Sequence, residues 1–503
     1  MNAKSIRMTA TAVLFPLMLA GCGGGSSSTQ AVLPTNVFGT INGSPLLTRI
    51  VGVGDSLTAG EQSNGLLGKT ITPNPLGALS PFPAVFATQG NGYYALLWSQ
   101  ANGGADPLNP AVSPLALIAP PGLGSSGSVL VPATAGGLTT IQAPCTGLDQ
   151  TALTSSTALS TRLNPGATPL DVAIPGQTLH EALYQFQPTA NPCVIYPNAG
   201  LQALNGILNA ENLFFNPILG NFSARTTQVQ AAVRVQPTLA LVWLGENDLL
   251  KFTFSNGAVA ASSASSFQAD MTQLITSLQN AGAKVAVANV LNILAAPQFL
   301  AVPAIHAALM ANGVPTGINA PITAAIDAFL SGFNVGNGGY LTLTGSTKIV
   351  AVVQASLPAI IGGTSPATAM QAGFTLLQSS SNAFGPGDYV TDSTATQTTQ
   401  LVAQYNTAIA AAVGGRGAAL VDVNAIALQV TGNGGVYPLP SNPHCCSIAY
   451  GGGLFSLDGI HPSNTFYALI ANAFILAVNK AYGTTIPATN VATINATDPF
   501  SPH

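Results

Sequence analysis

The sequence predicts an α/β fold in which helices cover both faces of a sheet of parallel strands. Short, continuously apolar runs alternate along the chain with stretches in which apolar residues recur at helical spacing. Strands buried on both faces read as continuous apolar runs, and their alternation with helices is typical of a parallel sheet. Beyond residue 22 the chain has no fixed-period repeat and no apolar run of about 20 residues, the length that spans a bilayer.

Five apolar runs are candidate strands. The first, 49–53, leads into a Gly-Asp-Ser turn, and the others lie at 170–174, 239–244, 285–290 and 419–423. Each run is shorter than a typical globular helix and is rich in Val, Ile, Leu or Ala. We therefore expect these runs to form one parallel sheet.

Three stretches predict helices. Apolar residues from Phe267 to Leu278 recur at helical spacing, and Gly282 follows as a stop signal. Residues 400–413 form a second predicted helix. Residues 463–478 form a third, which is apolar nearly all round and should therefore be buried.

Two long segments interrupt this alternation. Residues 61–165 are rich in Pro, Gly, Ser, Thr and Ala, and residues 292–390 mix short helices with the strand-like runs 340–344 and 349–353. Long loops in a compact domain are usually functional lids or disordered. We interpret both as insertions in one catalytic domain that spans 46–485, followed by a C-terminal tail at 486–503.

The composition excludes nucleic acid as an expected partner. Hydrophobic residues make up 47% of the 503 residues, whereas charged residues make up 6%, far below the roughly 25% of an ordinary soluble domain. With 12 Lys and Arg and a net charge of −4, the chain has too few cations for a face that binds phosphates.

The N-terminus predicts export and a lipid anchor. Lys4 and Arg7 precede an apolar stretch that is too short to span a membrane. The sequence Leu-Ala-Gly-Cys at residues 19–22 resembles the lipobox of bacterial lipoproteins, which implies removal of residues 1–21 and acylation of Cys22. Residues 22–45 then contain a flexible tether. Gly23 resembles the sorting signal for the outer membrane. An ordinary signal peptide with an incidental cysteine is the alternative.

Four further cysteines are present, and export would place them where disulfides persist. Cys145, Cys193, Cys445 and Cys446 allow three connectivities. We expect a Cys145–Cys193 disulfide, because adjacent cysteines bridge each other only with unusual backbone geometry. One bridge with two free thiols is the alternative. The spacing of Cys445 and Cys446 is also poor for a zinc site.

The turn after the first strand carries a candidate nucleophile. In Gly54-Asp55-Ser56-Leu57 an apolar strand ends in a tight turn that places Ser56 at the start of a helix. Backbone N–H groups there point toward a developing anion, and a serine becomes a nucleophile when a base takes its proton. A helix-capping serine is the alternative. The glycine spacing does not match a dinucleotide or phosphate loop.

A candidate base lies at the start of the last helix. Asp458 precedes His461 by three residues, so its carboxylate can bind Nδ1 of the ring and leave Nε2 free to accept the serine proton. A capping aspartate beside a surface histidine is the alternative. A metal site is not expected, because no other spaced cluster of His, Asp or Glu accompanies the pair.

These two blocks resemble the first and last motifs of the GDSL, or SGNH, hydrolase family. Gly-Glu-Asn-Asp at residues 245–248 matches the family's Gly-x-Asn-Asp turn, and Gly176 lies where the family has an oxyanion glycine. The resemblance implies an oxyanion hole formed by Ser56, Gly176 and Asn247. A turn glycine and a turn asparagine are the alternatives. We expect Asp55 and Asp248 to form turn hydrogen bonds and Glu246 to face solvent.

The resemblance also implies a fold and an activity. The fold is a three-layer α/β/α sandwich of the flavodoxin-like type, and the activity is ester hydrolysis through an acyl-enzyme on Ser56, with Asp458 and His461 as its activating pair and no cofactor. The apolar insertions and the lipid anchor favour lipid or acyl esters as substrates. Deacetylation of a polysaccharide, or a non-catalytic lipoprotein that binds a ligand, are the alternatives. The motifs lie farther apart than in compact family members, which leaves substrate specificity open.

Overall fold

The computed structural model describes residues 44–62, 65–66, 92–108, 113–116, 123–124, 166–186, 214–220, 222, 226–311, 316–379, 383–443, 445–456, 458–498 and 500–502. The predictions for the signal segment, Cys22, the tether up to residue 43, Cys145 and Cys193 lie outside these residues, as does most of the 61–165 insertion.

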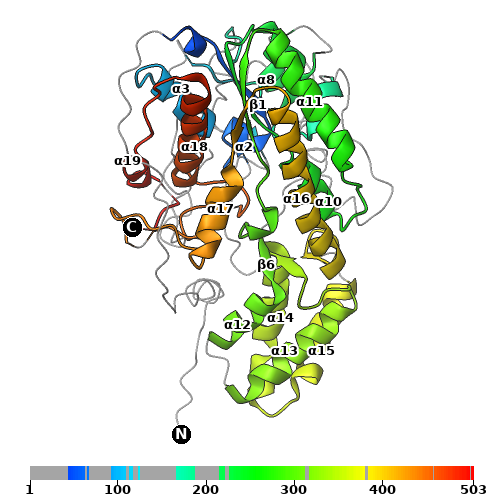
Figure 1. Ribbon diagram of the computed structural model, residues 1–503. Helices are drawn as coiled ribbons and strands as arrows, with labels where there is room; N and C mark the ends of the chain where they lie inside the picture. Colours follow the sequence, from blue (N-terminus) through cyan, green and yellow to red (C-terminus); the bar gives the residue numbers. More distant parts are fainter. Residues whose placement is uncertain are drawn as a thin grey trace.

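A parallel sheet of four strands forms the centre of the molecule (Figure 1). Its order is β1 (Ile50–Gly54), β4 (Leu239–Trp243), β5 (Lys284–Ala288) and β9 (Ala419–Val421), and each neighbouring pair is parallel. Four of the five predicted strands are confirmed in position and direction. The predicted α/β class is therefore correct.

The fifth predicted strand, 170–174, runs alongside the outer side of β1 without forming a full ladder. The amide of Gly52 donates to Leu170 O at 3.0 Å, and the amides of Val172 and Ile174 donate to Gly52 O and Gly54 O, both at 3.0 Å. An isolated parallel bridge joins Gly52 to Asp171. This segment therefore extends the sheet beyond β1, on the side away from β4.

Helices cover both faces of the sheet, and the side chains of each strand alternate between two hydrophobic clusters. Leu239, Leu241 and Trp243 of β4 belong to one cluster, and Ala240 and Val242 belong to the other, as the two-residue period of a strand requires. Because both faces are covered, the central strand β4 is apolar and buried along its whole length.

The helices divide between the faces as follows. The face of Ala240 is covered by α5 (Leu179–Tyr184), α8 (Phe215–Leu219), α9 (Gln228–Arg234), α10 (Glu246–Phe254), α11 (Ala264–Asn280) and α16 (Asp392–Gly414). The face of Leu241 is covered by α3 (Tyr93–Ala101), α17 (Val423–Gly432) and α18 (Asn464–Tyr482). The remaining short elements are η2 (Pro45–Leu47), α2 (Ser56–Ala59), β2 (Gly65–Leu66), β3 (Leu123–Gly124), η8 (Ile293–Ala295) and α19 (Val491–Asn495). All three predicted helices are confirmed, as α11, α16 and α18.

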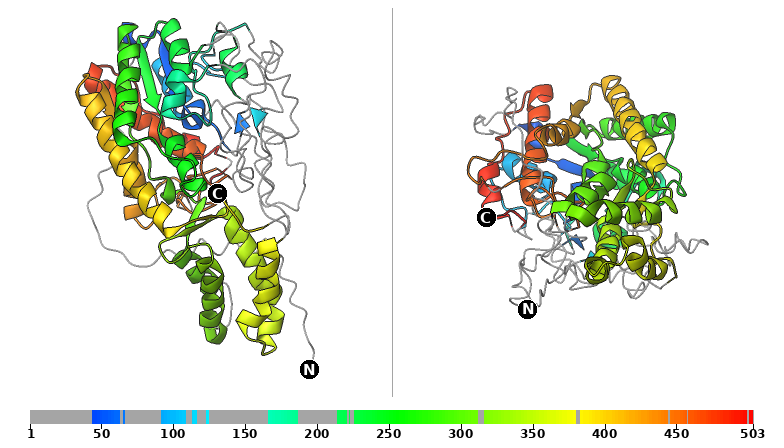
Figure 2. Two further views of the ribbon diagram at one scale, coloured as in Figure 1. Left: turned by 90° about the vertical axis from the view of Figure 1, so that its right-hand side faces the viewer. Right: turned by 90° about the horizontal axis from the view of Figure 1, so that it is seen from below.

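The insertion at 292–390 forms a projection with its own core (Figure 2). A small antiparallel sheet of β6 (Phe299–Ala301), β7 (Tyr340–Thr342) and β8 (Tyr389–Val390) forms its base. Its helices are α12 (Val302–Ala311), α13 (Thr316–Ser331), α14 (Leu343–Ile361) and α15 (Pro366–Ser379). Stacked rings such as Phe329 on Phe374, 4.4 Å between centroids, fill the space between the helices.

One predicted strand in this insertion is wrong. The run 349–353 lies inside α14, which begins where the Thr342 side chain accepts a hydrogen bond from the Gly345 amide. Ile349, Val350 and Val353 are buried in the core of the insertion, so packing on a helical face outweighs the strand preference of β-branched residues. Of the described helices, α14 alone is long and apolar enough to cross a membrane, and it packs against α13 and α15.

Candidate active site

Ser56 lies at the carboxyl end of β1, as the first residue of the short helix α2. Asp55 caps this helix, because its Oδ1 accepts a hydrogen bond of 3.0 Å from the Leu57 amide. Gly60, with a φ of 74°, ends the helix after one turn. A side chain at Gly54 would overlap Thr58, so the turn requires glycine there. The Ser56 side chain is buried, with 7% of the residue's surface exposed. The residue that caps α2 is Asp55, so Ser56 is not the helix cap.

Asp458 and His461 are in contact in the loop that precedes α18. Asp458 Oδ2 lies 2.7 Å from Nδ1 of His461, and Asp458 Oδ1 accepts the amides of Ile460 and His461, both at 2.8 Å. Gly459 permits this tight turn with a φ of 71°. The carboxylate therefore fixes the ring through its Nδ1 edge, and Nε2 faces away from Asp458.

The Nε2 edge of His461 faces Glu61, a residue that the sequence motifs did not indicate. Glu61 Oε2 lies 3.8 Å from His461 Nε2, and both side chains are 10% exposed. Within the described part of the chain, the Ser56 hydroxyl forms no hydrogen bond with His461. Asp55, the neighbour of Ser56, is nevertheless close enough to His461 for each to change the pKa of the other.

Asn247 lies beside the Ser56 turn. Its Nδ2 donates a hydrogen bond of 2.9 Å to Asp55 Oδ2, and both side chains are buried. Gly245 has a φ of 134°, and a side chain there would come within 2.7 Å of Val290. This glycine therefore allows β4 to turn sharply into α10, which places Asn247 at the carboxyl end of the sheet.

Gly176 follows the 170–174 segment, at the same end of the sheet. It is buried with a φ of 84°, a backbone conformation that favours glycine. Two residues later, Thr178 and Glu181 form a capping box at the start of α5. Since Ile174 bonds to Gly54, the structure places Gly176 on one side of the Ser56 turn and Asn247 on the other.

The carboxylates around this site have different roles. Asp248 accepts the Leu179 amide at 2.9 Å and the Ser262 hydroxyl at 3.1 Å, and so links α5 to α10. Glu246 was expected to face solvent, and this is wrong: it is 3% exposed and accepts the Trp243 indole N–H at 2.7 Å. The hydrogen bonds from the Trp243 indole and the Leu291 amide hold the Glu246 carboxylate inside the protein.

Burial and charge shift the pKa values at the site in opposite directions. Burial raises the pKa of Asp55 to about 7, despite the hydrogen bonds from Leu57 and Asn247 that lower it. Burial also raises the pKa of Asp458, but contact with His461 outweighs it and holds the pKa below its usual value. Burial alone would lower the pKa of His461, whereas Asp458, Glu61 and Asp55 together raise it to about 9.

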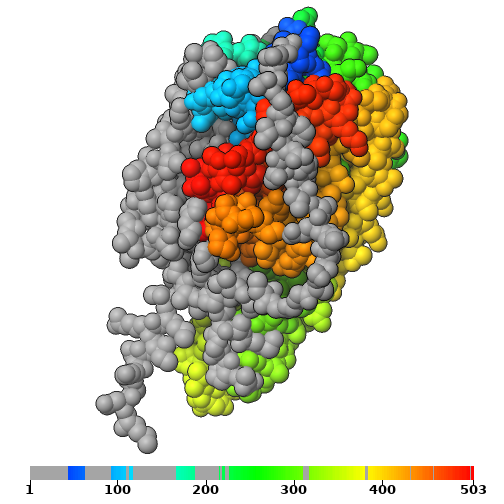
Figure 3. All heavy atoms as spheres, turned by 60° about the vertical axis from the view of Figure 1, so that its left-hand side comes forward, coloured from blue at the N-terminus to red at the C-terminus, as the bar shows by residue number. Residues whose placement is uncertain are grey.

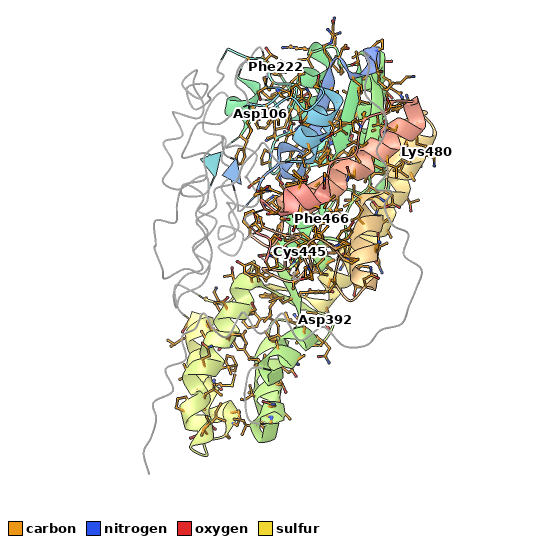
Figure 4. The ribbon with its side chains drawn as sticks, turned by 90° about the vertical axis from the view of Figure 1, so that its left-hand side faces the viewer. Asp106, Phe222, Asp392, Cys445, Phe466 and Lys480 are labelled. Atoms are coloured by element: carbon orange, nitrogen blue, oxygen red, sulfur yellow. A yellow bond between two sulfur atoms is a disulfide. The ribbon has the colours of Figure 1, made fainter. Side chains whose placement is uncertain are left out.

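A disulfide joins the adjacent residues Cys445 and Cys446, so the expectation that adjacent cysteines would not pair is wrong. The peptide bond between them is cis. The predicted Cys145–Cys193 disulfide falls outside the described residues. Cys445 lies near Phe466, at the first turn of α18, with Lys480 at the other end of that helix (Figure 4).

The C-terminal residues pack against this disulfide and against α18. Asn495 is 1% exposed, and its Nδ2 contacts Cys445 Sγ at 3.1 Å and Thr465 Oγ1 at 3.1 Å. Asp498 Oδ2 accepts the Thr465 amide at 2.7 Å. In Figure 3 the segments after α16 (orange) adjoin those of the C-terminus (red) on one face. The region expected to be a tail thus supports the start of α18, directly after His461.

Among the described residues, no group of three or more His, Cys, Asp and Glu side chains has the geometry to hold a metal ion. Comparison of the chain with protein-family models, curated proteins and solved structures finds no match.

Proposed function

We propose that the protein is a serine ester hydrolase of the GDSL, or SGNH, type, which cleaves carboxylic esters through an acyl-enzyme on Ser56. The observation that carries the proposal is the contact of Asp458 with Nδ1 of His461 at 2.7 Å, near a buried serine that begins a helix after a parallel strand. An aspartate bound to Nδ1 fixes the ring tautomer in which Nε2 can accept a proton.

In this mechanism His461 Nε2 takes the proton of Ser56 Oγ as the oxygen attacks the ester carbonyl. The tetrahedral intermediate collapses, the C–O bond to the alcohol breaks, and the proton on Nε2 passes to the leaving alcohol. Water then attacks the acyl-enzyme, with His461 again as the base, and the acid is released. Asp458 stays ionised and stabilises the imidazolium, as its lowered pKa favours.

The proposed oxyanion hole combines the amides of Ser56 and Gly176 with the side chain of Asn247. One N–H of the Asn247 amide binds Asp55, and an amide has a second N–H to donate. The bond to Asp55 orients the side chain before the substrate arrives. Such preorganised donors are typically worth about 3 kcal/mol each in the transition state.

The strand order supports the same site. From β1 the chain passes first to the 170–174 segment on one side and then to β4 on the other. In open parallel sheets, ligands bind at the carboxyl ends of the strands where the order reverses in this way. Ser56, Gly176 and Asn247 follow these three elements, so we further propose the three-layer α/β/α arrangement of that family.

We propose lipid or acyl esters as the substrate class. The 292–390 insertion contains only three charged residues, Asp327, Lys348 and Asp388, and its base contacts the catalytic loop where the Gln298 amide donates to Gly459 O at 2.9 Å. A chain-length series of p-nitrophenyl esters tests this class. A kcat/KM that is highest for acetate and falls with chain length would favour the deacetylase alternative.

The activity is tested with a fluorophosphonate probe and a soluble p-nitrophenyl ester. Ser56→Ala should lose labelling and at least about a thousandfold in kcat, with an almost unchanged melting temperature, because the Ser56 hydroxyl caps no helix. Ser263→Ala, at the serine that caps α11, is the matched control and should keep full activity. Wild-type turnover in Ser56→Ala, or no labelling of the wild type, would contradict the proposal.

We also propose that acylated Cys22 anchors the protein to the bacterial cell envelope, in the outer membrane. Cys22→Ser should move the protein from the membrane fraction to the soluble fraction, because one acyl chain contributes about 0.8 kcal/mol for each buried CH₂ group. Labelling with radioactive palmitate should disappear in the same variant. Labelling that persists in Cys22→Ser would contradict the anchor.

A further inference from the structure

Glu61 is held rigidly beside the catalytic loop by its backbone. Its amide donates to Ser56 O at 2.9 Å, which closes the turn after α2. Its carbonyl accepts the hydroxyl of Tyr467, on α18, at 3.0 Å. Glu61 is therefore tied both to the helix of the nucleophile and to the helix that follows His461.

The Glu61 side chain points at the one edge of the His461 ring that Asp458 leaves open. Oε2 of Glu61 lies 3.8 Å from Nε2, and Oδ2 of Asp458 lies 2.7 Å from Nδ1. Both carboxylates are buried. Within the described residues, Glu61 forms no ion pair with a lysine or arginine, so the imidazole is the only basic group paired with it there.

Among the residues that the structure describes, the charged groups that face His461 are acids. Asp458 lies in its own loop, Glu61 follows α2, and Asp55 caps α2. From α18, Tyr467 faces Glu61 and Asp458, and burial holds its pKa well above the usual value, so it stays neutral. Tyr450 faces Asp458, and burial raises its pKa as well. Each acid favours the protonated ring, and a protonated Nε2 cannot accept the proton of a serine.

We propose that Glu61 is a positioning residue of the catalytic histidine: in the resting protein its carboxylate pairs with the Nε2 edge of His461 and confines hydrolysis to alkaline pH. This inference rests on the proposed function, since it assigns His461 the role of general base. Activation then consists of one step, in which the Nε2 proton leaves for solvent and the neutral ring becomes able to accept the proton of Ser56.

The first test is the pH dependence of kcat/KM on a soluble p-nitrophenyl ester between about pH 5 and 10. A carboxylate within about 4–6 Å typically raises the pKa of a cation by roughly 1–3. Glu61→Gln keeps the shape of the side chain and removes its charge. The acid limb, which is the part of the pH profile where kcat/KM rises with pH, should therefore move to lower pH by at least about 1 unit. Relative to its own plateau, activity at pH 7 should then rise about tenfold or more. An unchanged acid limb would overturn the proposal.

Two variants separate charge from shape. Glu61→Asp retains a carboxylate, and its acid limb should stay nearer to that of the wild type than to that of Glu61→Gln. A limb that moves equally in both variants would overturn the proposal. Asp270→Asn removes a carboxylate that lies 2.9 Å from another histidine, His180, and should leave the acid limb unchanged.

A second measurement does not depend on activity. In full-length protein with isotope-labelled histidine, the His461 resonance is assigned by its loss in His461→Gln, and its pKa is read from an NMR titration. Glu61→Gln should lower this pKa by about 1 or more. If the wild type hydrolyses no ester at any pH but Glu61→Gln lowers the pKa of His461, the proposed function fails and the pairing of Glu61 with His461 stands. If Ser56-dependent hydrolysis is present but Glu61→Gln moves neither the acid limb of kcat/KM nor the pKa of His461, the pairing of Glu61 with His461 fails and the proposed function stands.

Discussion

The sheet region and the 292–390 insertion both have apolar cores, but they differ in what else they bury. Beside the parallel sheet, the carboxylates of Asp55, Glu246 and Asp458 are all less than a tenth exposed. In the described part of the insertion, Asp388 is the buried carboxylate, and Lys348 pairs with it at 2.8 Å. The core of the insertion consists mainly of aliphatic side chains and stacked aromatic rings.

This difference indicates a division of tasks. Burying a carboxylate costs free energy unless hydrogen bonds or charges offset it, and groups with strongly shifted pKa values concentrate at functional sites. The sheet region holds such groups around His461, whereas the insertion neutralises the one that it buries. We therefore expect substitutions in the sheet region to change turnover, and substitutions in the insertion to change local stability. One place where the two regions are in contact is Gly459, which adjoins Gln298 and Leu343.

The largest effect on turnover among these tests is expected at Asn247. Asn247→Ala removes a proposed oxyanion donor, so kcat should fall about a hundredfold or more with KM little changed. The lost hydrogen bond to Asp55 should cost about 1–3 kcal/mol of stability. Steady-state kinetics and thermal unfolding on the same samples measure both quantities.

The matched control for Asn247 is Asn289, which follows the next strand, β5. Asn289 is also buried, and its Nδ2 donates to Asp422 Oδ1 at 2.6 Å. Asn289→Ala should therefore lose a similar amount of stability and keep its kcat. If Asn247→Ala were destabilised but fully active, Asn247 would be a turn residue, and Ser56 and Gly176 would be the remaining donors.

An intermediate effect is expected where the two regions meet. Gly459 has a φ of 71°, and a Cβ there would lie 3.0 Å from the Gln298 amide nitrogen and from Leu343 Cδ1. Gly459→Ala should therefore displace the catalytic loop against the base of the insertion and lower kcat/KM about tenfold, because small displacements of catalytic groups are costly. Kinetics on a soluble ester measure this effect.

Gly483 provides a control in which a substitution causes backbone strain without a contact to the insertion. It ends α18 with a φ of 66°, and its Cβ would have no atom within 4 Å. Gly483→Ala should cost a similar backbone strain of about 1 kcal/mol without loss of kcat/KM. Equal losses of activity in both variants would show that the contact with the insertion is irrelevant to catalysis.

The smallest effect on turnover is expected inside the insertion. Phe329 stacks on Phe374 and is 7% exposed. Phe329→Ala should destabilise the core of the insertion by about 3–5 kcal/mol, while kcat on a short, soluble ester stays within about twofold. Hydrogen exchange should rise in the peptides of α13 and α15 and not in those of β4.

Phe267→Ala is the corresponding change in the sheet region. Phe267 stacks on Tyr405 with 4.0 Å between the ring centroids and is 1% exposed. This variant should lower the global melting temperature together with the activity. If Phe329→Ala also unfolded β4, the insertion and the sheet region would be one cooperative unit, and the comparison between them would no longer hold.

The strands and main helices could be predicted from sequence because each depends on a short-range pattern. β1 and β4 are buried along their whole length, and β5 is buried after Lys284, so each contains a continuous apolar run. Helices such as α11 place their apolar residues on one face. The topology then sets where the residues that follow the strands lie, because the carboxyl ends of parallel strands lie at the same edge of the sheet. For this reason the motifs, although far apart in sequence, follow neighbouring strands at one edge of the sheet.

Other features depend on residues that approach each other only in the folded chain. The run 349–353 became helical because the core of the insertion packs against α14. Glu246 is buried because Trp243 and the Leu291 amide bind it, and Cys445 pairs with its neighbour across a cis peptide bond that composition does not predict.

The sequence by itself determined the α/β class, the positions of the four sheet strands along the chain and the position of Ser56 at the end of β1. These properties follow from hydrophobic periodicity and from the turn chemistry of a few neighbouring residues. Asp458 was expected beside His461, but only the tertiary structure decided that Glu61 lies at the other edge of the ring. Glu61 faces Nε2 because α2, α18 and the catalytic loop converge. Electrostatic interactions act through space over a few ångströms, and no local pattern in the chain encodes that distance.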